Sequence, residues 1–339
     1  MNVVKFPNNV KESDIFKFCD EVEKNAGVDS IGIDFTHLGR IVPFTMVYVA
    51  KFIRDFNSRN PQTSVKCTGF KKHDYAANMG FFKAFGLQHG RAPNCSEGND
   101  NFVPYTILPV KEIVDQADEE WIAEQDVIEN RSEKLSQILA RESSGDLVDA
   151  LTFSIREIMR NVYEHSHSQN IEYCAQYWPY YNSVQIAILD NGIGLRESLK
   201  LNPHIQVNSD SDAIQQGLMP AISSKNYKGA RIDTNDPWHN SGFGLYMVSR
   251  ICRLGGTFLL CSGDHAIRLD EDGKHHMDLN HFVSGTVVKM VLKTDRLKSL
   301  SEMLSTFRNE GYEIAKEIKG LGFYEASSAS QMLSRDFKK

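Results

Sequence analysis

The sequence has no long apolar run and little cysteine. Its 339 residues include no stretch that approaches the roughly 20 apolar residues of a membrane-spanning helix. The N-terminus also has no extended apolar segment of the kind found in signal peptides. The six cysteines form no CxxC pair, which argues against a zinc site and suits a reducing compartment. We therefore expect a cytoplasmic protein that does not contact a membrane.

A P-loop and a basic surface are missing as well. No GxxxxGK[ST] motif occurs, which excludes a P-loop nucleotide site. The net charge of −6 gives no electrostatic basis for binding nucleic acid. The acidic excess is local, because residues 101–150 contain 12 acidic and only 4 basic residues. We interpret this block as a solvated connecting segment rather than as a docking tail.

The first part of the chain alternates strand and helix patterns. Strands are expected over residues 29–37 and 64–70, where β-branched and aromatic residues gather. Helices are expected over 42–56, where apolar residues recur at spacings of three and four, and over 71–85. The alternation predicts a small α/β domain over residues 1–95.

A second α/β domain is expected over residues 131–295. An irregular segment over 91–110 and an acidic connector over 96–130 lead to it, and an amphipathic helical tail over 296–339 follows it. The expected elements of this domain are a helix after residue 146, strands over 171–177 and 184–188, a lid over 196–240, a helix after residue 245, and strands over 257–261 and 285–292.

The stretch EIMRNVYEH places three polar residues four positions apart, namely Glu157, Asn161 and His165. An α-helix brings such residues onto one ridge, and here the ridge borders the apolar stripe. The border of an apolar stripe is the rim of the core, where a cleft would lie. Taken alone, the pattern also fits an amphipathic helix with a few polar boundary residues.

Three further motifs accompany this ridge. In LDNGIGL, the carboxylate of Asp190 can accept a hydrogen bond from an exocyclic amine such as that of adenine. The motif SGFGL at 241–245 opens a helix, and a helix N-terminus binds phosphate readily. Gly285 and Thr286 then enter the last strand, where a hydroxyl can join the recognition of a base. Each motif is weak alone, but the order and separation of all four are specific.

Together these motifs resemble the GHKL ATPase family, which includes gyrase, a heat-shock chaperone, histidine kinases and mismatch-repair proteins. EIMRNVYEH resembles its N box, LDNGIGL its first glycine box and SGFGL its second. The form ExxxNxxxH is closest to the bacterial anti-sigma-factor serine kinases. The resemblance implies a GHKL (Bergerat) α/β sandwich with a mixed sheet, and it implies ATP and Mg²⁺ as ligands.

The resemblance also implies roles for individual residues. Glu157 matches the general base that orients water or a hydroxyl, Asn161 the Mg²⁺ ligand and Asp190 the adenine-reading carboxylate. The other residues expected at the nucleotide are His165, Gly192, Gly194, Gly242, Phe243, Gly244, Leu245 and Thr286. The lid offers Lys225, Lys228 and Arg231 as partners of the γ-phosphate, although plain surface charge explains them equally well.

The N-terminal segment resembles the STAS domain of anti-sigma-factor antagonists. IDFTHLGRIVPFTMVYVA follows its strand–loop–helix pattern, and CTGFKKHDYAANMGFFKAFGL follows a later strand and helix. The loop that usually carries a phosphorylatable Asp-Ser pair here contains Val42, Pro43, Phe44 and Thr45. With no serine in this loop, we expect the domain to act by docking on its own chain or on a second copy.

Two other classes of site are disfavoured. His275, His276, Asp278 and His281 lie in a polar excursion between two expected strands, but their spacing fits no standard zinc pattern. No histidine occurs between residues 90 and 164, where a sensor histidine kinase would carry its phosphoacceptor.

Three hypotheses for function remain. The first is a bacterial regulator that binds Mg-ATP, hydrolyses it slowly and responds through contacts with a protein partner or within a homodimer. The second is a serine/threonine kinase that acts on a separate partner, such as a STAS-type protein. The third is an interaction module that binds ATP only to set its shape. Glu157 favours chemistry over the third.

Overall fold

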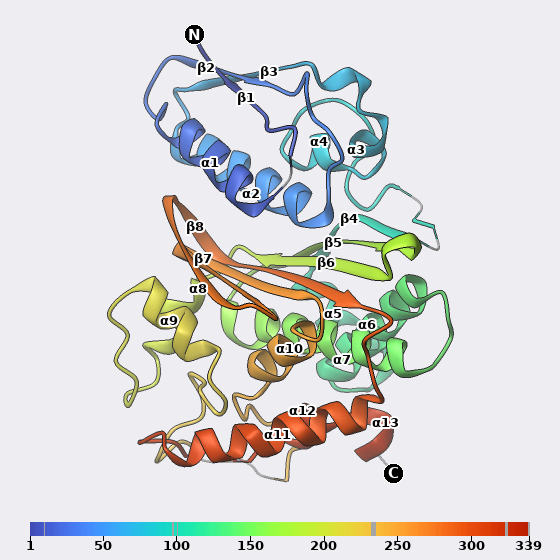
Figure 1. Cartoon of the computed structure of the whole chain (residues 1–339). Helices are drawn as coiled ribbons and strands as arrows, with labels where there is room; N and C mark the ends of the chain where they lie inside the picture. The colour runs from blue at the N-terminus through green and yellow to red at the C-terminus, as the bar shows by residue number, and fades with distance from the viewer. Residues whose placement is uncertain (10, 97, 100, 232–234, 323–324, 338–339) are drawn as a thin grey trace.

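The structure, a computed structural model, describes residues 1–339 except 10, 97, 100, 232–234, 323–324 and 338–339. Two β-sheets and their helices form successive layers (Figure 1). A small sheet lies at the N-terminal end, followed by two helices, a larger sheet, a second helical layer and a last helix near the C-terminus. Among the helices of this described part, none combines the length and apolar character needed to cross a bilayer.

The small sheet is parallel, with strand order β1-β2-β3. Its elements are β1 (Asn2–Lys5), α1 (Glu12–Glu23), β2 (Ser30–Asp34), α2 (Pro43–Arg59), β3 (Ser64–Thr68), η1 (Phe70–Lys72), α3 (Asp74–Asn78) and α4 (Phe81–Ala84). Both crossovers step in one direction, so right-handed connections place α1 and α2 on the same face. The expected α/β alternation is confirmed, except that the helix expected over 71–85 is broken at Gly80, whose φ is +86°.

The larger sheet has the order β4-β5-β6-β8-β7. Its strands are β4 (Phe102–Pro109), β5 (Asn170–Trp178), β6 (Ser183–Asp190), β7 (Thr257–Asp270) and β8 (Gly273–Lys293). Every pairing is antiparallel, so the expectation of a mixed sheet is wrong. β5–β6 and β7–β8 are hairpins, whereas residues 110–169 connect β4 to β5 and residues 191–256 connect β6 to β7.

Two strands differ from the sequence-based expectation. β4 occupies the segment expected to be irregular, because its prolines, Pro104 and Pro109, are tolerated in an edge strand. β7 and β8 are 14 and 21 residues long and pair as far as Asp270 and Gly273. The expected polar excursion over this part is therefore a long hairpin, and its Ala266, Ile267 and Leu279 are buried.

Helices cover the inner face of the larger sheet, which is the face turned away from the N-terminal sheet (Figure 1). The helical segments of this part are α5 (Val110–Glu120), α6 (Glu124–Ala140), α7 (Asp146–Asn161), η2 (Val162–Ser166), η3 (Pro179–Tyr181), α8 (Gly194–Leu199), α9 (Asp210–Gly217), α10 (Gly244–Cys252), α11 (Leu300–Lys316), α12 (Ser328–Gln331) and α13 (Ser334–Phe337). The segment expected as an acidic connector thus contains β4, α5 and the start of α6.

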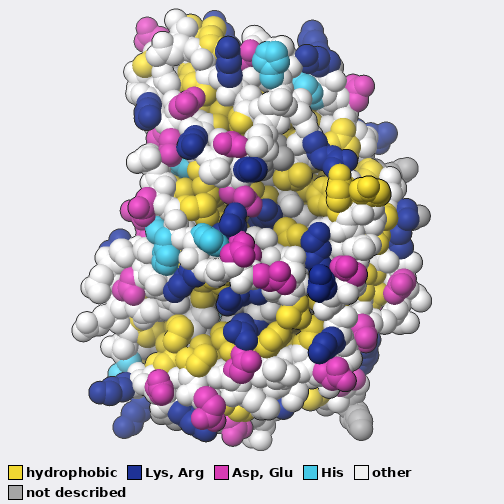
Figure 2. Space-filling model, in the orientation of Figure 1, with side chains coloured by type: hydrophobic (Ala, Val, Ile, Leu, Met, Phe, Trp, Pro, Cys, Tyr) yellow, Lys and Arg dark blue, Asp and Glu magenta, His cyan; other side chains and the backbone are white. Residues whose placement is uncertain are grey.

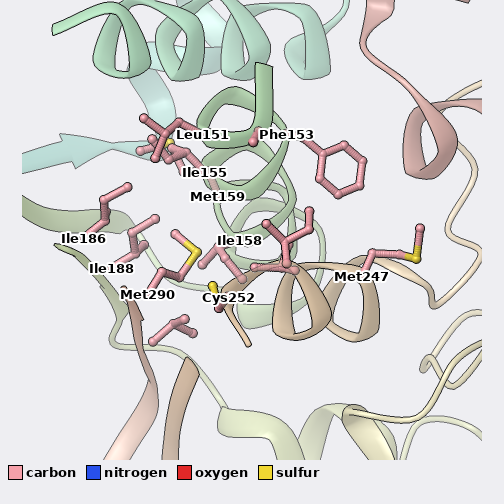
Figure 3. Close-up of a cluster of buried hydrophobic side chains, with 14 of the residues drawn as sticks. Leu151, Phe153, Ile155, Ile158, Met159, Ile186, Ile188, Met247, Cys252 and Met290 are labelled. Carbon is pink, nitrogen blue, oxygen red and sulfur yellow. The ribbon is translucent and has the colours of Figure 1, made fainter. Parts of the chain in front are cut away.

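The inner core lies between α7, α10 and the sheet (Figure 3). The apolar stripe of α7 presents Ile155 and Ile158 toward Ile186 and Ile188 of β6. All four side chains are at most 2% exposed. Burying each such side chain contributes about 1.5–3 kcal/mol relative to leaving it in water. This packing fixes how α7 and the end of β6 face each other.

The outer face of the same sheet is covered by the N-terminal domain. α2 packs against β5 and β6, and α1 packs against β8. Cys174, Ala187 and Leu189 point into this contact and are fully buried. Since both faces of β6 are covered, all eight of its residues are buried. The loop around Pro43 is part of the contact, because the Phe44 amide donates to Gln185 Oε1 at 3.2 Å.

The visible surface carries both signs of charge. Figure 2 shows acidic and basic side chains interspersed over this face of the molecule. The histidines of the disfavoured metal cluster lie in two separate places. His281 contacts Asp20 at 2.6 Å and Tyr48 at 2.7 Å between the domains, whereas His276 contacts His265 on the hairpin. The described residues include no group of three or more metal-ligating side chains placed to hold a metal ion.

Candidate functional site

Helix α7 changes geometry where its polar ridge ends. The α-helical part stops at Asn161, and η2 continues it as a π-helical turn over Val162–Ser166. The hydroxyl of Ser166 donates to the carbonyl of Val162 at 2.7 Å, which competes with the regular helical bond. The expected ridge therefore reaches His165 through a wider turn than an α-helix gives.

One pocket nevertheless collects most of the expected residues. It is partly open to solvent and is lined by both charged and apolar side chains. Nine of the expected residues line it: Glu157, Asn161, His165, Asp190, Gly194, Gly242, Gly244, Leu245 and Thr286. They come from α7, η2, the end of β6, the starts of α8 and α10 and the middle of β8.

Five expected residues do not line the pocket. Phe243 is fully buried in the core, where its ring meets Tyr246 and Tyr312 edge-on. Lys225 and Lys228 are exposed at the surface. Arg231, the third lid cation, is exposed too. Part of the expected lid, residues 232–234, lies outside the described residues.

Gly192 is the fifth of these residues, and it packs behind the pocket. A Cβ at this position would lie 1.9 Å from the carbonyl oxygen of Ser166, so the turn after β6 can approach η2 only with glycine there. Gly285 has the same role on β8, since its φ is +68° and a Cβ would lie 2.4 Å from the carbonyl oxygen of Asp190. The two glycines bring three chain segments together around Asp190.

Asp190 ends β6 as a buried carboxylate. It is 3% exposed, and burial raises its pKa to about 6, even though hydrogen bonds from Gly192 and Thr286 and the charge of Lys51 favour the ionised form. The Gly192 amide donates to Asp190 Oδ1 at 2.8 Å. The side chain is therefore ionised at neutral pH and oriented by its neighbours, as a carboxylate that reads an amine must be.

Glu157 is the carboxylate at the α7 side of the pocket. Its Oε1 accepts from Arg156 Nη2 at 3.1 Å and from Arg160 Nη1 at 3.3 Å. Its Oε2 faces two other groups: the hydroxyl of Ser330 lies 3.5 Å away, and a Cβ on Gly244 would lie 2.4 Å away. The carboxylate is thus oriented through one oxygen and presents the other toward the start of α10.

His165 links η2 to the lid. Its Nδ1 lies 3.1 Å from Ser224 Oγ, and its Nε2 contacts Asn240 Nδ2. Burial lowers its pKa to about 4, and the nearby charge of Glu164 only partly offsets this effect. The imidazole is neutral at pH 7 and holds both ends of the segment between residues 224 and 240 against the helix.

Asn161 presents a side-chain amide to the pocket. Its Nδ2 is buried and has no hydrogen-bond partner among the described residues. A buried polar atom without a partner is costly, and a ligand in the pocket can satisfy it. Rotation of the amide by half a turn presents its oxygen instead, which is the kind of donor that Mg²⁺ prefers.

A lysine of the N-terminal domain supports the site, and the sequence analysis did not identify it. Lys51 of α2 is 2% exposed, and its ammonium donates to Asp55 at 2.7 Å, Asn191 at 2.8 Å and Ser284 at 2.7 Å. Asn191 follows Asp190 directly, and Ser284 lies two residues before Thr286. Helix α2 therefore joins the two chain segments that hold the buried carboxylate and its threonine.

Comparisons with models of protein families, with curated proteins and with solved structures found no match to this chain. A function has to follow from the pocket and from the residues that line it.

Proposed function

We propose that this protein binds Mg-ATP and hydrolyses it slowly, as a bacterial regulator built from a GHKL-type nucleotide domain and a degenerate STAS-like domain. One observation carries the proposal. Nine residues, selected by motif from four separate stretches of the sequence, line a single pocket. Chance would not bring the two glycine motifs, the polar ridge and the late threonine to one place.

The chemistry of the pocket is suited to the parts of ATP. Asp190 and Thr286 form the end that would read the adenine amine. The start of α10 presents backbone N–H groups beside Gly242 and Gly244, where phosphates would bind. Glu157 lies against Gly244, so the general base would stand at the phosphate end. A side chain at position 244 would push the Glu157 carboxylate out of this place.

Asn161 is the residue that would hold Mg²⁺. The unpartnered amide in the pocket fits this role, and phosphate oxygens and water would supply the other ligands. Bound there, Mg²⁺ would neutralise charge on the phosphates and so favour attack on the terminal one.

The position of the STAS-like domain limits how a protein partner can bind. Its helix α2 already covers β5 and β6, and Pro43, Phe44 and Thr45 are buried in that contact. A STAS-type partner, or a second copy of this chain, would have to use another surface or displace this domain. Lys51 contacts both segments around Asp190, so such a displacement would also disturb the end of the pocket that would bind adenine.

We expect Mg-ATP to raise the melting temperature of the protein. A ligand that binds only the folded state stabilises it by about 2.7 kcal/mol at a hundredfold excess over Kd. Asp190→Asn should remove most of this shift, because an amide loses the charge-assisted bond to the adenine amine. GTP at the same concentration should give a much smaller shift, and an unaltered ATP shift in Asp190→Asn would remove Asp190 from the adenine site.

We also expect ligand affinity to fall in acid. The folded pKa of Asp190 is about 6, above the ordinary 3.8, so the buried carboxyl takes up its proton as the pH falls through 6. Protonation stabilises the fold, and this contribution is lost as the pH rises through 6. Adenine binding needs the ionised form, so affinity should fall about tenfold for each pH unit below about 6.

Calorimetry with adenosine tests this expectation, because adenosine has no phosphate that titrates in the same range. Asp190→Asn should bind weakly at every pH and show no such slope. His165 stays neutral from pH 5 to 8, since its pKa is about 4, and it does not contribute to the slope. A wild-type affinity that is constant from pH 7.5 to 4.5 would contradict the assignment.

A further inference from the structure

The C-terminal segment places a serine hydroxyl in the pocket. Ser330 of α12 lines it, is 3% exposed, and donates to Glu157 Oε2 at 3.5 Å. Ser327 and Ser241 surround the same hydroxyl at 3.3 and 3.5 Å. The chain separation between Ser330 and Glu157 is 173 residues, so only the fold brings them together.

One guanidinium positions both of these residues. Arg156 is fully buried and donates to Glu157 Oε1 at 3.1 Å. The same group donates to the carbonyl oxygens of Ala329 and Met332, which flank Ser330. Arg156 thus orients the carboxylate and holds the hydroxyl-bearing segment against it. A segment that merely closed the pocket would not require its hydroxyl to face the general base.

Other hydroxyls near the pocket are placed differently. Ser224 contacts His165, Ser241 contacts the serines of the C-terminal segment, and Thr286 contacts Asp190. Within the part of the chain that the structure describes, Ser330 is the pocket hydroxyl that is hydrogen-bonded to Glu157. Thr45, in the first turn of α2, is fully buried and lies outside the pocket.

We propose that Ser330 is a phosphorylation site that this chain modifies itself, with ATP as the phosphoryl donor. The inference rests on the proposed function, because it needs ATP in this pocket. Ser330 Oγ forms a bond to the γ-phosphorus, and the bond from that phosphorus to the β,γ-bridging oxygen breaks. ADP leaves with the electron pair of that bond, and the hydroxyl proton goes to Glu157 Oε2.

The product would change the contact that presents it. A phosphoserine carries about −1.5 to −2 charges at neutral pH, and here it would stand against the carboxylate of Glu157. Repulsion between the two would weaken the hold of Arg156 on the segment from Ala329 to Met332. Phosphorylation would therefore release α12 from α7 and open the pocket, which gives the ATP reaction a regulatory output.

Incubation with Mg-ATP followed by mass spectrometry of the intact chain and its peptides tests the proposal. We expect one phosphate per chain on Ser330 and none in Ser330→Ala. Ser328→Ala is the matched control, since Ser328 lies on the same short helix and makes no contact with Glu157, and it should be labelled like the wild type. Glu157→Gln should reduce labelling at least a hundredfold. Labelling within one chain should proceed at a rate unchanged by tenfold dilution.

A parallel measurement of the ATP-dependent melting shift separates two kinds of failure. If wild type and Ser330→Ala both show the normal shift but the wild type carries no phosphate on Ser330, this inference is overturned and the proposed function stays in place. Label that persists in Ser330→Ala, or a rate that falls tenfold on dilution, would overturn it as well. If wild type shows no ATP shift, the proposed function fails and the inference fails with it.

Discussion

Replacement of Arg156 by methionine is expected to lower the free energy of unfolding by about 3–5 kcal/mol, as is typical when one partner of a buried ion pair is removed. Arg156 is fully buried and bonds Glu129 Oε2 at 2.5 Å as well as Glu157. Methionine fills a similar volume but leaves two nearly buried carboxylates without their shared partner. It also removes the hydrogen bonds from Arg156 to the carbonyl oxygens of Ala329 and Met332.

Arg335→Met provides the matched control. Arg335 also pairs with carboxylates, those of Asp149 and, at 4.0 Å, Asp336, but its side chain is 51% exposed. Exposed pairs contribute about 0–1 kcal/mol, so this variant should unfold almost like the wild type. Urea unfolding of both variants measures the difference. Equal destabilisation by the two substitutions would show that Arg156 does not hold α7, α6 and the C-terminal segment together.

The sequence predicted the pocket better than the sheet around it. Glu157, Asp190 and Gly244 were found because each belongs to a short motif whose spacing has a chemical reason. Such a motif can be recognised from its spacing alone, without knowledge of the rest of the fold. β4 was missed because Pro104 and Pro109 suggest a loop, and only its place at the sheet edge makes them acceptable.

The site residues that were not predicted from the sequence contact partners that are far away along the chain. Lys51 reaches Ser284, 233 residues further along the chain, and Ser330 reaches Glu157 over 173 residues. No local pattern encodes such contacts. One signal was nevertheless present for Lys51, since a lysine within an otherwise buried stretch of α2 needs a buried acceptor. Serines at a chain end carry no comparable signal.

The contact between the domains has a similar explanation. The alternation of Val184, Ile186 and Ile188 predicts one buried face of β6, and it does not say that a second domain covers the other face. Ala187 and Cys174 are small enough to let α2 approach the sheet, and Gln185 receives the Phe44 amide. These features are evident only when the two domains are seen together (Figure 1). The loop that lacks a phosphorylatable serine is thereby used for packing.

Glu157→Gln is expected to abolish phosphoryl transfer while ATP still binds. General-base catalysis contributes about 10²–10⁴-fold to such reactions, and an amide cannot accept the proton. The substitution keeps the shape of the side chain, and the glutamine oxygen can still accept from Arg156 or Arg160. The rate of phosphoryl transfer from ATP, to water or to protein, should therefore fall at least a hundredfold in a single-turnover measurement. The ATP-dependent melting shift should persist.

Asn161→Ala is the informative companion, because it changes the same helix one turn away. Loss of its amide should weaken ATP binding in the presence of Mg²⁺ and have little effect when Mg²⁺ is chelated. The two variants thus separate the group that takes the proton from the group that holds the substrate. Wild-type turnover in Glu157→Gln would exclude a catalytic role. Absence of turnover in the wild type, together with tight ATP binding, would instead favour a protein that binds ATP only to set its conformation. Glu157 would then serve to hold Arg156 and the C-terminal segment in place.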